Sequence, residues 1–229
     1  MLFDLDGTLI DTAPDLVVAV TGMLEALQRP VPPPQRIERY VGKGIPRLVH
    51  RALTEDMQAD AEPALHARAL ALFEGIYRQQ SGRGAMLYAG VAEALAQLRS
   101  AGLPLACVTN KSRSFTLPLL EQFDLDSQFD VVVAGDDAGA RKPDPAPVQL
   151  ALSRLSQRCP SIALEPSRTV MIGDSANDVL AARRAGCLAW CVPYGYREGE
   201  TLEALGADRL VDDIAHATRL ILGLEADTR

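Results

Sequence analysis

Five short stretches of the chain are almost continuously apolar, and each ends in a small, polar or acidic residue. They are residues 2–6, 104–110, 131–136, 169–174 and 188–192. A strand that is buried on both faces has this pattern, whereas a half-exposed strand alternates apolar and polar residues. The sequence therefore predicts that these stretches are strands of a parallel sheet.

Helical patterns lie between these apolar stretches. They cover residues 90–100, 115–123, 147–155 and 177–185. In the first of them, apolar residues recur at positions 91, 94, 95 and 98, and Gly102 then gives a helix stop signal. Strands and helices that alternate in this way are typical of βαβ units. We therefore predict an α/β fold with a doubly wound parallel sheet and a Rossmann-like core.

Residues 15–84 interrupt this alternation. Helical periodicity runs through residues 16–27, 45–53 and 64–77, and no stretch resembles a buried strand. The proline-rich residues 30–34 predict a rigid loop, and residues 81–84 predict the hinge by which the chain returns. We expect a helical cap domain, residues 15–84, inserted into a catalytic core formed by residues 1–14 and 85–229.

Composition and charge exclude several classes of protein. The 229 residues are 48% hydrophobic and 23% charged, as in ordinary globular proteins. The net charge is −7 without a long basic block, which argues against nucleic-acid binding. No apolar run is long enough to cross a membrane, and the acidic start, Met1 to Asp6, is unlike a secretory signal. We expect a cytoplasmic protein that is a monomer or a homodimer.

Two residue types are informative because of their number. The four cysteines form no CxxC pair, so we expect buried free thiols rather than disulfides or zinc ligands. The chain has 20 arginines but only three lysines: Lys43, Lys111 and Lys142. A codon bias toward arginine explains the general excess. The same bias makes each remaining lysine a candidate functional residue, because arginine cannot always replace a compact ammonium.

The polar residues that follow the predicted strands have a common chemistry of carboxylates, small donors and one amine. They are Asp4, Asp6, Thr8, Thr109, Asn110, Lys142, Asp174 and Asp178. Ligands of open α/β sheets bind beyond the carboxyl ends of the strands, so these side chains should converge. Clustered carboxylates repel one another unless a hard cation such as Mg²⁺ joins them. The lysine and the small donors suit an anionic ligand, and the whole set suits phosphoryl transfer.

Each of these features also has a structural explanation when it stands alone. Asp4 and Asp6 can form a capped turn, Thr109 and Asn110 can cap a helix, and Lys142 can lie in a surface turn. These explanations do not account for their appearance at successive strand ends in this order.

Together, the four segments resemble the four motifs of the haloacid dehalogenase superfamily. They are Asp4-Leu5-Asp6-Gly7-Thr8-Leu9, Val108-Thr109-Asn110, Lys142-Pro143 and Gly173-Asp174-Ser175-Ala176-Asn177-Asp178. The resemblance spans the whole chain and implies that residues 15–84 are the helical cap of that superfamily.

This resemblance implies a role for each motif residue. Asp4 would be the nucleophile that forms an aspartyl-phosphate, and Asp6 the general acid and base. Magnesium would be bound by Asp4, the carbonyl of Asp6 and Asp174. The residues that hold the phosphoryl oxygens would be Thr109, Asn110 and Lys142, with Thr8 and Asp178 in support.

The resemblance also narrows the reaction. Dehalogenases lack the second aspartate, and phosphonoacetaldehyde hydrolases have alanine at the position of Asp6. β-Phosphoglucomutases usually have valine at the position of Thr8. Longer stretches, residues 6–16 and 40–49, are most similar to the phosphoglycolate phosphatases, which implies a small phosphorylated metabolite as substrate.

The segment Gly42-Lys43-Gly44 is the predicted substrate loop of the cap. Two glycines let backbone amides approach a small carboxylate, and Lys43 is the only lysine of the cap. We predict that this loop selects 2-phosphoglycolate; the alternative is that Lys43 is a solvated loop residue without contact to the substrate. Hydrolysis of pyrophosphate, sugar phosphates or nucleotides, and a non-catalytic binding role on the same fold, remain open at this point.

Overall fold

The computed structural model describes residues 1–225 and contains one central parallel sheet. Its strands lie in the order β5-β4-β1-β6-β7-β8, and every neighbouring pair is parallel. Their bounds are β1 (Leu2–Phe3), β4 (Ala106–Val108), β5 (Val131–Val133), β6 (Val170–Gly173), β7 (Leu188–Cys191) and β8 (Arg209–Leu210). The five predicted strands are confirmed, and β8 is an additional short edge strand.

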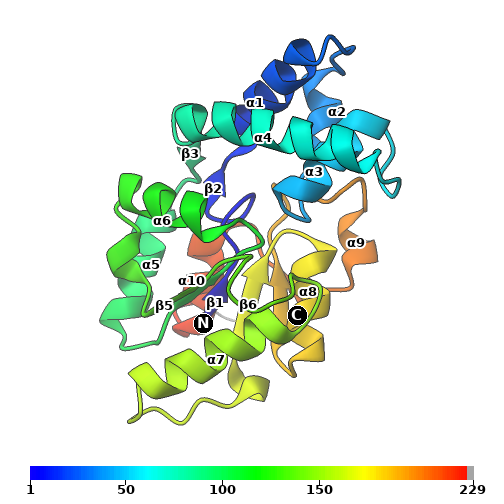
Figure 1. The fold of residues 1–229 in the computed structure, drawn as a ribbon. Coiled ribbons are helices and arrows are strands. Elements are labelled where there is room, and N and C mark those ends of the chain that lie inside the picture. Colours follow the sequence, from blue (N-terminus) through cyan, green and yellow to red (C-terminus); the bar gives the residue numbers. More distant parts are fainter. Residues whose placement is uncertain (226–229) are drawn as a thin grey trace.

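Helices cover both faces of this sheet (Figure 1). They are α5 (Val91–Ser100), α6 (Arg113–Gln122), α7 (Ala146–Arg158), α8 (Ala176–Arg184), the short α9 (Leu202–Leu205) and α10 (Ile214–Ile221), with 3-10 turns at Asp126–Gln128 and Pro166–Arg168. Because successive side chains of a strand point to opposite faces, Phe3 packs with α5, α6 and α10, whereas Leu2 packs with α7 and α8. The doubly wound fold is therefore confirmed.

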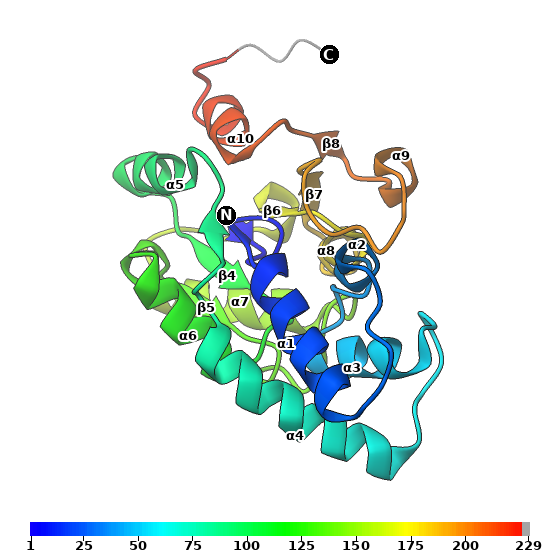
Figure 2. The same cartoon turned by 90° about the horizontal axis from the view of Figure 1, so that it is seen from above.

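A helical insertion lies between β1 and β4. It consists of α1 (Ala13–Ala26), α2 (Pro34–Glu38), α3 (Ile45–Thr54) and α4 (Pro63–Gln80). Figure 1 shows these helices gathered at one end of the molecule, apart from those that cover the sheet, and Figure 2 is a view from above onto that end. They bury their own apolar cluster, to which the core adds Phe115 of α6 and the partly buried Tyr196. Pro34 begins α2 and so lies outside the loop predicted for residues 30–34.

Two short antiparallel strands carry the chain into the insertion and back. They are β2 (Ile10–Asp11) and β3 (Met86–Leu87). Neither was predicted, because two residues show no periodicity and their pairing joins positions far apart in the sequence. The same reason applies to β8, while α2 and α9 are too short to show a helical repeat.

The return segment is held by one buried carboxylate. Asp15, in the first turn of α1, accepts hydrogen bonds from the backbone N–H groups of Gly82 and Gly84, each at 2.7 Å, and from the Gln80 amide at 3.2 Å. Asp15 is 1% exposed, so water cannot replace these bonds. A single side chain thus joins the start and the end of the insertion.

Two further expectations concern the chain as a whole. None of the described helices is long and apolar enough to cross a membrane. The four cysteines are free, and Cys107, Cys187 and Cys191 are buried.

Replacing Asp15 with Ala should destabilise the protein by about 3 kcal/mol, because two buried N–H groups lose a charged acceptor. Asp126→Ala is the matched control: this aspartate is exposed, and we expect a change within about 0.5 kcal/mol. Urea unfolding followed by circular dichroism measures both. Equal free energies of unfolding for the two variants would show that Asp15 does not secure the return segment.

Candidate active site

Most of the predicted site residues meet in one cavity between the sheet and the insertion, but Thr8, Lys43 and Asp178 do not line it. The core side of the cavity presents Asp4, Asp6, Thr109, Lys142 and Asp174. The opposite side is mainly apolar, with Leu16, Val41, Ile45 and Leu48 from the insertion and the backbone of Gly42 and Gly44 beside them. A polar floor under an apolar cover suits a small, strongly polar ligand that is enclosed away from water.

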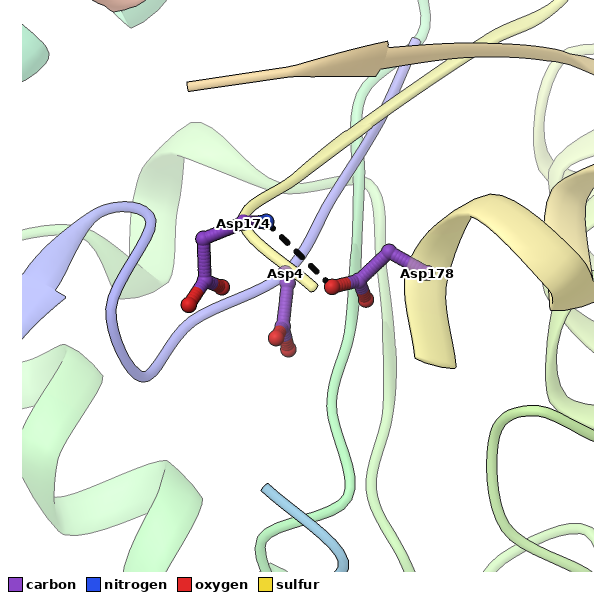
Figure 3. Close-up of side chains that lie close together, drawn as sticks. All are labelled: Asp4, Asp174 and Asp178. Carbon is purple, nitrogen blue, oxygen red and sulfur yellow. Dashed lines mark hydrogen bonds between the residues drawn. The ribbon is translucent and has the colours of Figure 1, made fainter. Parts of the chain in front are cut away.

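Three buried aspartates form the acidic centre of the cavity (Figure 3). Asp4 follows β1, Asp174 follows β6, and Asp178 reaches in from α8. One oxygen of each lies within 4.8 Å of the others. Burial and the charge of Asp178 raise the pKa of Asp4 to about 7. Burial, with Asp178 and Asp4 beside it, also raises the pKa of Asp174 above its ordinary value. The three charges therefore repel one another in a dry site.

Lys142 lies among these charges and contacts two of them. Its Nζ is 2.7 Å from both Asp4 Oδ1 and Asp178 Oδ1, and it donates to the carbonyl of Val108 at 2.6 Å. Burial alone would lower the pKa of this ammonium, but Asp178 and Asp4 raise it. The Asp4 contact is an ion pair without hydrogen-bond geometry, so Asp4 Oδ1 is a buried oxygen without a hydrogen-bond donor.

The carboxylate of Asp178 is bonded to other groups of the protein. Besides Lys142, it accepts hydrogen bonds from the backbone N–H of Asp174 and from the N–H and hydroxyl of Ser175. Ser175 and Asp178 together form a capping box at the start of α8. Asp178 was expected to orient Lys142 or a metal-bound water, and this geometry favours Lys142. Its contacts with the loop after β6 were not predicted.

Asp174 is positioned by two segments that are remote in sequence. Thr8 donates to Asp174 Oδ1 at 2.9 Å, and the backbone N–H of Tyr196 donates to Oδ2 at 2.5 Å. A Cβ added at Gly195 would lie 2.2 Å from Asp174 Oδ2, so only glycine permits this approach. The loop after β7 thus completes the site, and Tyr196 was not predicted to belong to it.

Asp6 is paired with a second lysine of the cavity, Lys111. Lys111 Nζ donates to Asp6 Oδ1 at 2.9 Å and to the Tyr77 hydroxyl, from α4, at 2.7 Å. Thr12 donates to the same Asp6 oxygen at 2.7 Å. Thr12 lies in the stretch 6–16 that resembles the phosphoglycolate phosphatases but was given no role there, and nothing in the local sequence marks Tyr77. Lys111 carried one signal, since it is one of three lysines and directly follows Asn110.

The motif residues Thr109 and Asn110 differ in which of their side-chain polar groups remain available to a ligand. Thr109 Oγ1 accepts from the N–H of Lys111 at 3.1 Å, so its O–H is directed elsewhere. The Asn110 amide is bonded to both backbone groups of Lys142 and donates to the carbonyl of Gly42. Asn110 therefore fixes the position of Lys142 and ties the cap loop to the core, and its predicted contact with phosphate stays a prediction.

The cap loop presents its glycines and not its lysine to the cavity. Gly42 and Gly44 line the cavity, whereas Lys43 does not. The Lys43 side chain is 39% exposed, and its Nζ lies 4.0 Å from Glu198 Oε2. Glu198 itself accepts from the fully buried Arg51 of α3 at 2.5 Å and from Asn177 of α8 at 3.1 Å. The carboxylate of Glu198 therefore anchors the cap loop, residues 42–44, to the core from outside the cavity.

A buried acidic cluster with a paired lysine, at the carboxyl edge of a doubly wound sheet and under a helical cover, defines an enzyme that transfers an anionic group. A sequence profile of haloacid dehalogenase-like hydrolases matches residues 1–186. The chain belongs to this family of hydrolases.

Individual relatives agree with this family. A phosphoglycolate phosphatase of Nitrosospira multiformis is 43% identical, over 96% of this chain and 94% of that protein. Another, from Chromobacterium violaceum, is 43% identical over 93% and 91% of the two chains. The crystal structure of a predicted phosphoglycolate phosphatase from Haemophilus somnus 129PT superposes with a TM-score of 0.85 at 28% identity, covering 98% of this chain and 96% of that one.

Magnesium affinity should increase roughly tenfold between pH 6 and pH 8. Below its pKa of about 7, Asp4 binds a proton that competes with a cation, and above it the carboxylate is free to bind. Isothermal titration calorimetry at both pH values, in two buffers of different ionisation enthalpy, measures the affinity and the proton release. An affinity that does not change with pH would contradict the raised pKa.

Proposed function

We propose that this protein is a magnesium-dependent phosphatase that converts 2-phosphoglycolate to glycolate and phosphate through an aspartyl-phosphate on Asp4. The single observation that carries the proposal is the contact of Lys142 with Asp4 and Asp178 inside the acidic cluster. Membership of the hydrolase family and the names of the relatives support the substrate.

The residues present fit the chemistry in two steps. Asp4 attacks phosphorus, the bond between phosphorus and the ester oxygen breaks, and Asp6 gives a proton to the departing oxygen. In the second step Asp6 takes a proton from a water molecule, whose oxygen attacks the phosphorus of the aspartyl-phosphate and releases Asp4. Lys142 and Thr109 hold the phosphoryl oxygens in both steps. Asn110 would add its backbone N–H, because its side-chain amide is bonded to Lys142 and Gly42. Lys111 and Thr12 hold Asp6 in place throughout.

The donor set also fits magnesium. All candidate ligands are oxygens, the carboxylates repel one another, and Asp4 Oδ1 is a buried oxygen without a hydrogen-bond donor. Asp4, the carbonyl of Asp6 and Asp174 would hold the ion, while Asp178 is engaged with Lys142 and Ser175. Bound magnesium would neutralise charge between the carboxylates and the phosphoryl oxygens.

The insertion would act as a cap that encloses the substrate. We place its bounds at residues 15–84, with the catalytic core at 1–14 and 85–229. Asp15 and the glycines of the return segment lie at these bounds. Hinge motion there would admit substrate and then exclude water. A cytoplasmic location and a monomeric or homodimeric state stay predictions.

A panel of phosphomonoesters tests the substrate. With magnesium, we expect kcat/KM for 2-phosphoglycolate to exceed that for sugar phosphates, nucleoside monophosphates and pyrophosphate by at least about tenfold. EDTA should abolish turnover and magnesium should restore it. Asp4→Asn is the control that attributes activity to this site, since an amide cannot form the acyl phosphate.

The possible results separate the alternatives. A better substrate elsewhere in the panel would replace 2-phosphoglycolate and keep the mechanism. Absence of turnover for every ester would leave a phosphate-binding protein on the same fold, and full activity after chelation would refute the magnesium role.

Replacing Asp6 with Asn should slow hydrolysis of alkyl phosphates by roughly 10²–10⁴-fold, the usual contribution of a general acid. The loss should be much smaller for p-nitrophenyl phosphate, because its leaving group departs without a proton. Steady-state rates for both classes of ester provide the comparison. An equal loss for the two would remove Asp6 from the acid role.

A further inference from the structure

Two lysine side chains line the cavity, and they differ in how completely the protein engages their ammonium groups. Among the described residues, Lys111 and Lys142 are the cationic side chains that line it. Lys142 donates hydrogen bonds to Asp178 and to the carbonyl of Val108 and forms an ion pair with Asp4, so its charge is shared between two carboxylates. Lys111 has two acceptors among the described residues, Asp6 and the Tyr77 hydroxyl. An ammonium has three N–H donors, so Lys111 has one left for a ligand.

The position of Lys111 is set by its partner. Asp6 is the group that would protonate the departing ester oxygen, so the leaving group must lie against it. Lys111 Nζ is 2.9 Å from Asp6 and therefore borders the same space. In 2-phosphoglycolate a single methylene separates the ester oxygen from the carboxylate, so that carboxylate cannot lie far from Lys111.

The rest of the cover has no competing charge. The side chains that the insertion adds to the cavity are apolar, namely Leu16, Val41, Ile45 and Leu48. Lys43 is half-exposed outside the cavity, and Arg51 is paired with Glu198. A carboxylate enclosed here needs a cation, because leaving it unpaired in an apolar site costs several kcal/mol.

We propose that Lys111 binds the carboxylate of the substrate and so selects for carboxylated phosphate esters. This inference rests on the proposed phosphatase function. Lys111 would bridge Asp6 and the substrate carboxylate, much as Lys142 bridges Asp4 and Asp178 in the same cavity. Tyr77 makes the ammonium rigid before substrate arrives. Its ring packs against Phe73 at 5.5 Å and Phe115 at 4.8 Å between centroids, so little freedom is lost on binding.

The test compares two substrates that differ only in charge: 2-phosphoglycolate and its neutral amide. Selectivity is the ratio of their kcat/KM values. In Lys111→Met we expect this ratio to fall roughly 10- to 100-fold, the usual effect of losing a charge-assisted hydrogen bond. Lys43→Met is the matched comparison, with a ratio close to that of the wild-type protein. Tyr77→Phe keeps the ring packing and should lower the ratio by a smaller factor.

Comparing two substrates distinguishes a loss of carboxylate recognition from damage to Asp6 and from a wrong substrate assignment. Lys111 also touches Asp6, but damage to Asp6 slows both substrates and leaves the ratio unchanged, which would overturn the inference. A fall of the ratio in Lys43→Met instead of Lys111→Met would overturn it as well. If Lys111→Met does not fold, an unchanged ratio in Tyr77→Phe would count against the inference and a lowered ratio would support it. A wild-type protein without preference for 2-phosphoglycolate would overturn the proposed substrate itself, and that result appears before any variant is made.

Discussion

The ammonium of Lys142 is the interaction on which the site depends. Asp4, Asp174 and Asp178 are buried close together, and such an arrangement is strongly unfavourable without a nearby positive charge. Lys142 supplies that charge to Asp4 and Asp178 and donates to the carbonyl at the end of β4. One side chain therefore links β1, β4 and α8. Burial, together with the remaining repulsion, raises the pKa values of Asp4 and Asp174, and a magnesium ion would relieve that repulsion.

Polar contacts, more than apolar burial, connect the insertion to this centre. The insertion has its own apolar cluster, to which, within the described residues, the core adds buried Phe115 and partly buried Tyr196. Across the boundary run the contacts of Lys111 with Tyr77, of Asn110 with Gly42 and of Glu198 with Arg51. Polar contacts can exchange with water when two parts of a protein separate, whereas a large apolar interface resists separation. The polar boundary between the insertion and the core would therefore allow the insertion to open as a cap.

The loop after β7 connects the acidic cluster to the base of the insertion. The N–H of Tyr196 holds Asp174, and its hydroxyl accepts from the N–H groups of Thr12 and Ala13, where α1 begins. The same hydroxyl donates to Asp11 of β2. One residue thus ties the acidic cluster to the point where the chain leaves the core. Its position explains why the site includes a segment that carries no motif.

The sequence by itself determined the sheet, the helices that cover it and the order of the motifs. Continuous apolar runs identify strands buried on both faces, and a carboxylate at the end of such a strand must lie at the ligand-binding edge. The convergence of Asp4 and Asp174 follows from these two facts, whereas Lys142 lies in the long loop after β5 and is positioned by its backbone hydrogen bonds to Asn110. The short elements β2, β3 and β8 could not be predicted, because their pairing depends on distant segments.

Only the tertiary structure decided which side chains complete the site. Lys43 and Lys111 are equally conspicuous in a chain with three lysines. The fold leaves Lys43 beside Glu198 at the surface and places Lys111 between Asp6 and Tyr77 inside the cavity. The difference arises because Lys111 follows a buried strand of the core, whereas the position of Lys43 depends on how the insertion packs across it. Contacts between elements far apart in the sequence leave no local pattern, so Tyr77, Thr12 and Tyr196 emerge only from the folded chain.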